Sequence, residues 1–200
     1  MLDTSIYPKV DLDTYQKRTT LKDGTKVLLR PMVAEDRDAL YEFFKSVPRE
    51  EARYLRNDVK SRLVIEKWAK NLDYGKTLPI LALKDDVIIA DATINRRKFG
   101  WKWHLGTVRI FVHKDYRDME LTHLMLHELT RIAYRLGIEK LVAEIPEVNE
   151  STLISFKKAG YQLEAAIPNL VKDRENMPVD LVVMMKDIKP AQDDTYGYDF

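Results

Sequence analysis

The 200-residue sequence contains no cysteine. This absence excludes disulfides, thiolate nucleophiles and zinc sites built on cysteine, and it fits a reducing compartment. Long apolar runs are also missing, since no stretch approaches the roughly 20 residues that span a bilayer. The opening segment MLDTSIYPKVDLD has neither the basic start nor the apolar centre of a secretion signal. We therefore expect a cytoplasmic protein without a membrane partner.

A large net charge is missing as well. The sequence has 33 Lys and Arg residues against 32 Asp and Glu residues, so no global field favours nucleic acid or an anionic membrane. A hydrophobic content of 45% and the lack of a Gly-, Ser- or Pro-rich linker indicate one compact domain. We expect an N-terminal arm over residues 1–18, a domain over 19–188 and a C-terminal tail over 189–200.

Apolar periodicity and turn residues predict a chain that alternates strands and helices. Asp23-Gly24 favours a tight hairpin turn, and two apolar strands are expected to join at Asp85-Asp86. Gly137 is typical of a helix end with a left-handed residue after the last turn. In chain order, the expected elements are two short strands ending at Pro31, helices over 34–45 and 59–72, strands over 78–86, 87–97 and 104–112, a helix over 119–136, a strand over 140–148, a short helix capped by Asn149, and two strands from Tyr161 and over 179–188. The apolar strand residues expected in the sheet core are Leu81, Leu83, Val87, Ile88, Ile89, Ile110 and Val142.

Two longer segments carry a family resemblance. They are DGTKVLLRPMVAEDRDALYEFFKSVPREEARYLR and VRIFVHKDYRDMELTHLMLHELTRIAYRLGIEKLVAEIPEVNESTLISFKKAGY. With the order of elements, they resemble the GNAT superfamily of acetyl-CoA-dependent N-acetyltransferases, closest to the bacterial protein-lysine acetyltransferases. The resemblance implies an α+β (mixed α/β) fold with a central, mostly antiparallel mixed sheet flanked by helices. It also implies direct transfer of an acetyl group from acetyl-CoA to a protein lysine or a small amine.

A helix start preceded by a turn suits the diphosphate of coenzyme A, because unpaired N–H groups and the positive end of the helix dipole attract an anion. Here that turn runs from Tyr116 to Thr122. The resemblance further implies that the strand ending at Val112 diverges from the strand ending near Ile145, so that backbone groups bind the pantetheine arm. The cofactor-binding residues implied in this way are Phe111, Val112, Arg117, Asp118, Met119, Glu120, Leu121, Thr122 and Asn149.

Several positions depart from the family pattern. Glu120 and Thr122 stand where the family has small residues, and a carboxylate about 6 Å from a phosphate repels it by about 3 kcal/mol at an effective dielectric of about 20. Thr107 stands where related enzymes carry a general-base glutamate. Phe156 stands where many carry a tyrosine that protonates the leaving thiolate. Glu144, on the strand across the expected divergence, is the candidate base.

These departures leave a second function open, a catalytically silent GNAT-like module that senses acyl-CoA or binds a protein partner. An exposed final strand or the aromatic C-terminal tail could also pair two copies of the chain.

The basic and aromatic cluster, residues 96–103, resembles a stacking surface for single-stranded nucleic acid. The balanced charge of the chain argues against that interpretation, and a hairpin with one packed side or a partner surface explains the same residues.

The sequence contains four histidines. His123 and His127 lie one helical turn apart, and Glu120 precedes His123 by three residues. The remaining ligands of a helical metal site are missing, so a solvated helix face is favoured and no metal is expected. His104 and His113, which flank one expected strand, are interpreted as structural or exposed.

Overall fold

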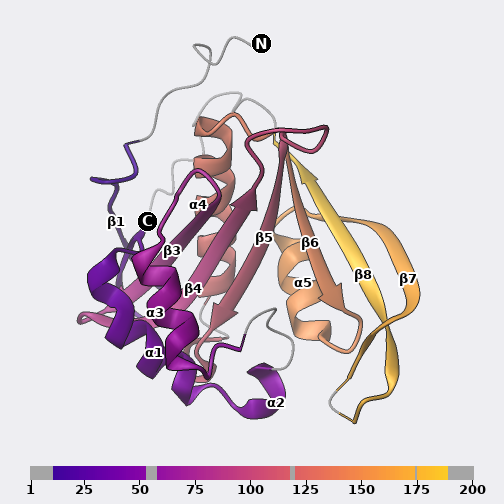
Figure 1. Cartoon of the computed structure of the whole chain (residues 1–200), viewed down its shortest axis with the longest axis horizontal. Helices are drawn as coiled ribbons and strands as arrows, with labels where there is room; N and C mark the ends of the chain where they lie inside the picture. The colour runs from indigo at the N-terminus through magenta and orange to yellow at the C-terminus, as the bar shows by residue number, and fades with distance from the viewer. Residues whose placement is uncertain (1–10, 53–57, 118–119, 174, 189–200) are drawn as a thin grey trace.

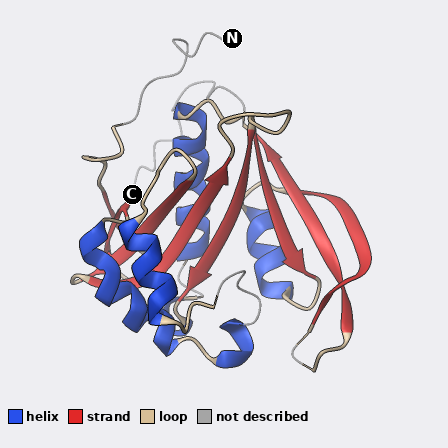
Figure 2. Ribbon diagram, in the orientation of Figure 1, coloured by secondary structure: helices blue, strands red, loops and turns tan. Residues whose placement is uncertain are grey.

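The computed structural model describes residues 11–52, 58–117, 120–173 and 175–188, and its strands form one sheet with helices on both faces (Figure 1, Figure 2). The strand order is β1-β2-β3-β4-β5-β6-β8-β7, in which β5 and β6 are parallel and the other neighbours antiparallel. This arrangement confirms the predicted mixed, mostly antiparallel sheet. The strands are β1 (Lys17–Thr20), β2 (Lys26–Pro31), β3 (Thr77–Lys84), β4 (Val87–Arg96), β5 (Leu105–Val112), β6 (Lys140–Pro146), β7 (Gln162–Lys172) and β8 (Pro178–Asp187). The helices are α1 (Arg37–Ser46), α2 (Arg49–Ala52), α3 (Arg62–Lys70), α4 (Leu121–Arg135) and α5 (Glu150–Lys158), with 3-10 turns η2 (Ala34–Asp36) and η3 (Lys114–Tyr116).

Alternate residues of the central strands face different helices. Ala92 of β4 and Val108 of β5 belong to a core that includes Met125 of α4. On the opposite face, Leu81 of β3 belongs to a second core with Phe44 of α1 and residues of α3. Because side chains in a strand alternate, the odd-numbered residues of β4 from Asp91 onward and of β5 face the side of α1 and α3. Figure 1 shows α1 and α3 in front of the sheet and α4 behind it.

Two predicted chain reversals are present. Asp85 and Asp86, between β3 and β4, have φ angles of 48° and 63°, the left-handed pair that a two-residue hairpin needs. At the end of α4, Gly137 has a φ of 70° and the N–H of Ile138 donates to the carbonyl of Ala133 at 3.0 Å. This hydrogen bond is that of a Schellman motif, so the predicted end of the long helix is confirmed.

The structure corrects some details of the sequence analysis. α4 begins at Leu121 rather than at 119, because Glu120 has a left-handed φ of 61°. α2, a single helical turn, was not predicted. Val87, expected in the core, is 63% exposed because it directly follows the hairpin turn. Of its companions, Ile110 is half-buried, and the buried ones are Leu81, Leu83, Ile88, Ile89 and Val142.

The expected ends of the chain fall largely outside this description. Residues 1–10 of the arm and the whole tail, 189–200, lie outside the described residues. β1 pairs with β2, so the sheet already includes the end of the expected arm. Within the described ranges, no helix combines the length and apolar character that crossing a bilayer requires.

Candidate functional site

The parallel strands β5 and β6 are paired at one end only. Leu105–Thr107 pairs with Lys140–Val142, and beyond this short ladder the strands diverge (Figure 1). β5 continues to Val112 while it remains paired with β4 on its other side. The edge of β5 toward β6 therefore has no ladder partner among the described strands over residues 108–112. Such an edge leaves backbone N–H and C=O groups for a ligand, and it is the divergence that the resemblance implied.

Glu120 stands directly before α4, with φ 61° and ψ 1°. A side chain in this left-handed region costs about 1 kcal/mol relative to glycine. The family resemblance places a glycine at this position, and glycine adopts the observed φ without strain. The carboxylate forms an ion pair with the ammonium group of Lys22, from the turn between β1 and β2. Lys22 thereby offsets the negative charge at the start of α4.

Arg117 lies against the end of β5. Its Nε donates to the carbonyl of Val112 at 3.1 Å, and its guanidinium carbon lies 5.6 Å from the centre of the Phe111 ring. The other two guanidinium nitrogens donate to the carboxylate of Glu51 in α2. Arg117, Val112 and Phe111, three of the predicted cofactor-binding residues, are therefore in contact. Glu51 neutralises the positive charge of Arg117, which was expected to face a diphosphate. Glu51 was not among the residues predicted from the sequence.

The remaining predicted cofactor residues lie in three places. Asp118 and Met119 are outside the described residues. Leu121 is fully buried in the core, so only its backbone N–H can contribute to an anion site, while Thr122 is half-buried. Asn149 is the N-cap of α5, directly after β6, and its side chain makes no capping hydrogen bond. Their roles toward a cofactor stay predictions.

Glu144, the predicted base, is an exposed residue of β6. Thr107 and Val142 are register partners, so Glu144, two residues further on, lies on the same face of the sheet as Thr107. This is the face that α1 and α3 cover over β3 and β4. Phe156 is 2% exposed and packs edge-on against Tyr161, with ring centres 4.8 Å apart. Phe156 therefore belongs to the core and supplies no proton to a leaving thiolate.

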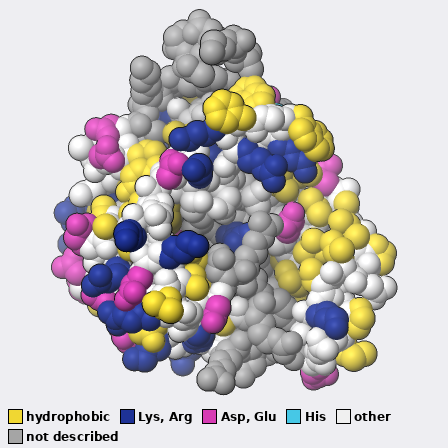
Figure 3. All heavy atoms as spheres, in the orientation of Figure 1, with side chains coloured by type: hydrophobic (Ala, Val, Ile, Leu, Met, Phe, Trp, Pro, Cys, Tyr) yellow, Lys and Arg dark blue, Asp and Glu magenta, His cyan; other side chains and the backbone are white. Residues whose placement is uncertain are grey.

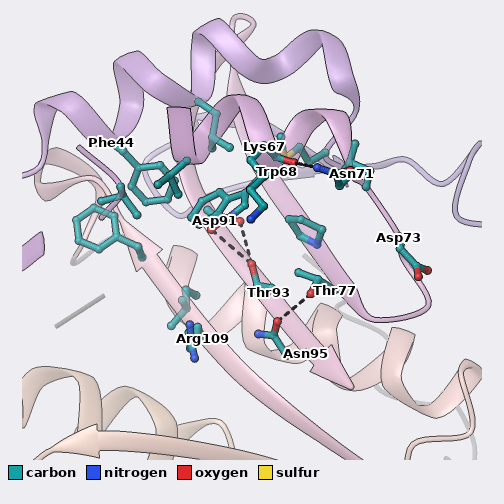
Figure 4. Close-up of a pocket in the computed structure, with 18 residues that line it drawn as sticks. Phe44, Lys67, Trp68, Asn71, Asp73, Thr77, Asp91, Thr93, Asn95 and Arg109 are labelled. Carbon is teal, nitrogen blue, oxygen red and sulfur yellow. Dashed lines mark hydrogen bonds between the residues drawn. The ribbon is translucent and has the colours of Figure 1, made fainter. Parts of the chain in front are cut away.

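A cavity of about 430 Å³ lies between the sheet and the helices α1 and α3 (Figure 4). Its volume falls in the range of small-molecule sites. The walls of the cavity are mainly apolar. They include Met32, which follows β2, Leu40 and Phe44 of α1, Val64 and Trp68 of α3, and Leu72, which follows α3.

The floor of this cavity is polar, although it belongs to the centre of the sheet. Thr77 of β3, Asp91, Thr93 and Asn95 of β4, and Arg109 of β5 share one face on adjacent strands. The Thr77 hydroxyl donates to Asn95 Oδ1 at 3.1 Å, and the Thr93 hydroxyl donates to Asp91 Oδ1 at 3.3 Å (Figure 4). Polar side chains below two helices add little to a hydrophobic core, so these five residues are candidates for ligand contact.

Asp91 has an unusual protonation equilibrium. Burial raises the pKa of its carboxyl group to about 7, although the Thr93 hydroxyl and the charge of Arg109 act in the opposite direction. The residue is nevertheless only half-buried, because it lines the cavity. A carboxyl group with a pKa near neutrality can exchange a proton with a ligand at physiological pH. The other charged residues among those lining the cavity are Lys67 of α3 and Asp73, which follows α3.

The polar floor was not predicted from the sequence. Residues 87–97 were expected to form an apolar strand, yet residues 90–95, Ala-Asp-Ala-Thr-Ile-Asn, alternate strictly between apolar and polar. In a central strand that helices cover on both faces, such alternation marks one face as polar and therefore unusual. That signal identifies Asp91, Thr93 and Asn95.

Phe111 connects the cavity with the opening between β5 and β6. Its backbone belongs to the segment of β5 that has left the ladder. Its ring lines the cavity and lies 5.8 Å from the ring of Phe43 and 6.4 Å from that of Phe44, centre to centre. Across β4 and β5, Phe111 is the register partner of Asp91. Asp91 therefore lies one strand spacing, about 5 Å, from the strand that borders the opening.

The basic and aromatic cluster, residues 96–103, forms the end of β4 and the loop before β5. Phe99 and Trp101 are 86% and 83% exposed, so the packed-hairpin interpretation is wrong for both. The Lys102 ammonium nitrogen lies 4.9 Å from the centre of the Trp101 ring. In Figure 3, apolar and basic side chains lie side by side at the end of the molecule where Figure 1 places this loop. A nucleic-acid or protein partner for this surface stays a prediction.

The histidines take surface and loop positions. His123 and His127 are exposed on α4. His113 accepts a hydrogen bond from the N–H of Asp115 at 3.4 Å, and the His104 ring is half-buried. Across the described part of the chain, no group of three His, Cys, Asp or Glu side chains is placed to hold a metal ion.

Comparison with known proteins agrees with this geometry. A family model described as "Acetyltransferase (GNAT) domain" matches residues 26–162. The GNAT domain of PAT from S. lividans is 19% identical, with a TM-score of 0.71 over 86% of this chain and 96% of that one. The structure of yncA from Salmonella typhimurium with its cofactor acetyl-CoA is 18% identical, with a TM-score of 0.69 over 84% and 96%. A ribosomal-protein-S5-alanine acetyltransferase from Vibrio fischeri is 12% identical, with a TM-score of 0.72 over 87% and 100%. No curated protein sequence matches the chain, and identities this low show a shared fold alone.

Proposed function

The chain belongs to the GNAT acetyltransferase family, and from this membership we propose that it transfers an acetyl group from acetyl-CoA to a primary amine. The amine nitrogen attacks the thioester carbon, a C–N bond forms and the C–S bond breaks. Coenzyme A leaves as a thiolate, which takes up the proton that the acylated nitrogen loses. The observation that carries this proposal is the position of Phe111, where the opening between β5 and β6 meets a cavity with a polar floor.

Acetyl-CoA fits the opening through groups that this chain provides. The edge of β5 that has left the ladder offers backbone hydrogen bonds to a pantetheine arm. The first N–H groups of α4 suit a diphosphate, and the ion pair between Lys22 and Glu120 offsets the charge of the intervening carboxylate. We assign cofactor binding to the residues that the sequence predicted: Phe111, Val112, Arg117, Asp118, Met119, Glu120, Leu121, Thr122 and Asn149.

The cavity below α1 and α3 suits the acceptor. Apolar walls with a polar floor favour an amine at the end of an apolar stem, such as a lysine side chain or a small monoamine. The two acidic lining residues, Asp73 and Asp91, are matched by two basic ones, Lys67 and Arg109. A polyamine with several positive charges therefore gains little in this cavity.

Two measurements test the proposal. In thermal denaturation, a ligand at 100 times its dissociation constant adds about 2.7 kcal/mol, so saturating acetyl-CoA should raise the Tm while an equal concentration of ATP should not. Release of coenzyme A with a panel of lysine peptides and small monoamines should then show turnover. A Tm that acetyl-CoA does not change, together with no release with any acceptor, refutes the proposal.

The burial of Phe156 favours a second candidate function. With Phe156 packed in the core and Thr107 in place of a base, the chain could bind acyl-CoA as a sensor without transferring the acyl group. If the chain is such a sensor, acetyl-CoA should raise the Tm by the same amount as it would for an acetyltransferase. A sensor, however, should release no coenzyme A at any pH with any amine.

A further inference from the structure

We propose that Asp91 is the general base that removes the proton from the acceptor amine. This inference rests on the proposed function, because it requires acetyl transfer at the point where the cavity meets the opening. A proton moves from the ammonium nitrogen to a carboxylate oxygen of Asp91, and the freed lone pair forms the C–N bond while the C–S bond breaks. The acylated nitrogen then gives up its second surplus proton, which the departing thiolate of coenzyme A takes up, and Asp91 releases the first proton to solvent.

The position of Asp91 fits this role. It lies in the floor of the cavity, and its register partner is Phe111, in the segment of β5 that borders the opening. An amine bound in this cavity therefore lies beside both the carboxylate and the strand that borders the opening. The Thr93 hydroxyl donates to the carboxylate at 3.3 Å and holds its orientation. A base must lie within hydrogen-bond reach of the proton it accepts, and the floor of the cavity provides that reach.

The other groups near the transfer point are less suited. Thr107 has no basic group at neutral pH, and Glu144, the base expected from the sequence, is exposed to solvent on β6. Asp73, the second carboxylate lining the cavity, accepts a hydrogen bond from the N–H of Gly75 at 2.9 Å and pairs with Lys76 and Lys98. Asp91 therefore combines a half-buried setting with access from the cavity.

The surroundings of Asp91 set the pH at which it becomes basic. Burial raises its pKa to about 7, against the smaller effects of Thr93 on β4 and Arg109 on β5. α3 contributes Lys67 to the cavity and the following loop contributes Asp73, while the lining residues from α1 are apolar. Asp91 is protonated below about pH 7 and is a base above it, so catalysis requires the higher pH.

The test compares kcat/KM over pH 6–10 for the wild type, Asp91→Asn, Asp91→Glu and Glu144→Gln. A general base contributes about 100-fold or more to the rate, so kcat/KM at pH 8 should be lower by about that factor in Asp91→Asn. In the wild type, kcat/KM should fall below about pH 7 as Asp91 becomes protonated. This fall, the acidic limb of the profile, should be missing in Asp91→Asn. Its rate should recover toward pH 10, where a lysine-like amine with a pKa of about 10.4 deprotonates without help. Asp91→Glu should retain the acidic limb. Acetyl-CoA affinity, measured by calorimetry, should be the same for wild type and Asp91→Asn.

A matched control removes a carboxylate elsewhere. Glu66 pairs with Arg62 on the outer side of α3, so Glu66→Gln should keep both the wild-type rate and the acidic limb. An acidic limb that survives Asp91→Asn, or one that disappears in Glu144→Gln instead, overturns the assignment of Asp91 while leaving acetyl transfer intact. A wild type without turnover at any pH overturns the proposed function itself. Should Asp91→Asn fail to fold, Asp91→Glu decides, because loss of the limb in that folded variant contradicts the role of Asp91.

Discussion

The ammonium group of Lys22 forms an ion pair with the carboxylate of Glu120, the residue with a left-handed backbone at the start of α4. The pair joins the hairpin turn between β1 and β2 to the expected diphosphate site. It places a positive charge from outside the turn next to the carboxylate that stands where the family pattern has glycine. The two residues are far apart in the sequence, so the pairing could not be inferred from the motif alone.

Replacing Glu120 should strengthen cofactor binding. Glu120→Gly removes a charge that repels phosphate and a side chain in the left-handed region, so the Kd for acetyl-CoA should fall about tenfold. Lys22→Gln leaves the carboxylate unneutralised and should raise the Kd. Isothermal titration calorimetry at low salt measures both. Equal Kd values for wild type and Glu120→Gly would show that the start of α4 does not meet the diphosphate.

The pairing of Arg117 with Glu51 predicts a second pair of effects. Glu51→Gln releases the guanidinium group from its ion pair, so acetyl-CoA should bind a few fold more tightly. Arg117→Gln should weaken binding and reduce its dependence on salt, because one charge contact is lost. Calorimetry at two salt concentrations gives both quantities. If Arg117→Gln binds like the wild type at both concentrations, Arg117 has only a structural role beside Val112.

The protonation of Asp91 predicts how stability depends on pH. Raising a carboxyl pKa from 3.8 to about 7 corresponds to about 4 kcal/mol. The free energy of unfolding is highest below pH 3.8, where the carboxyl group is protonated in both the folded and the unfolded chain. It falls by that amount as the pH rises through about 7, because only the unfolded chain ionises freely. Asp91→Asn, which cannot ionise, should therefore gain stability over the wild type, by about 2–3 kcal/mol more at pH 8 than at pH 5. Urea unfolding at the two pH values measures this difference, and a gain that does not change with pH would contradict the buried setting of Asp91.

The Thr93 hydroxyl should tune the same equilibrium. Its hydrogen bond favours the charged carboxylate and lowers the pKa of Asp91, so Thr93→Val should raise that pKa. The acidic limb of kcat/KM should consequently move to higher pH, with acetyl-CoA affinity unchanged. A pH profile identical to that of the wild type would mean that another group controls the limb.

The sequence predicted most of the fold because its local signals agreed with one another. The apolar period of α4, Gly137 at its end, and the turn residues Asp23-Gly24 and Asp85-Asp86 each specify a local shape that tertiary contacts did not override. The start of α4 was misplaced because a left-handed glutamate is rare and no propensity predicts it. The divergence of β5 from β6 came from the family resemblance rather than from the residues.

The candidate site was less predictable for a physical reason. The ion pairs that Glu51 and Lys22 form join segments distant in the chain, and no local pattern reports such contacts. Asp91 did leave a signal, since polar residues alternate through β4, but apolar content alone made that strand resemble core. Its significance depends on the cavity above it, which only the packing of α1 and α3 creates.

Transfer of isotopically labelled acetyl from acetyl-CoA, followed by mass spectrometry of the acceptor, tests the central claim most directly. Wild-type protein at pH 8, with a lysine peptide or a small monoamine, should place the label on the amine nitrogen and release one coenzyme A for each acetyl group transferred. Protein that binds acetyl-CoA but leaves every offered amine unlabelled over pH 6–10 would contradict acetyl transfer and identify the chain as a silent acyl-CoA-binding module.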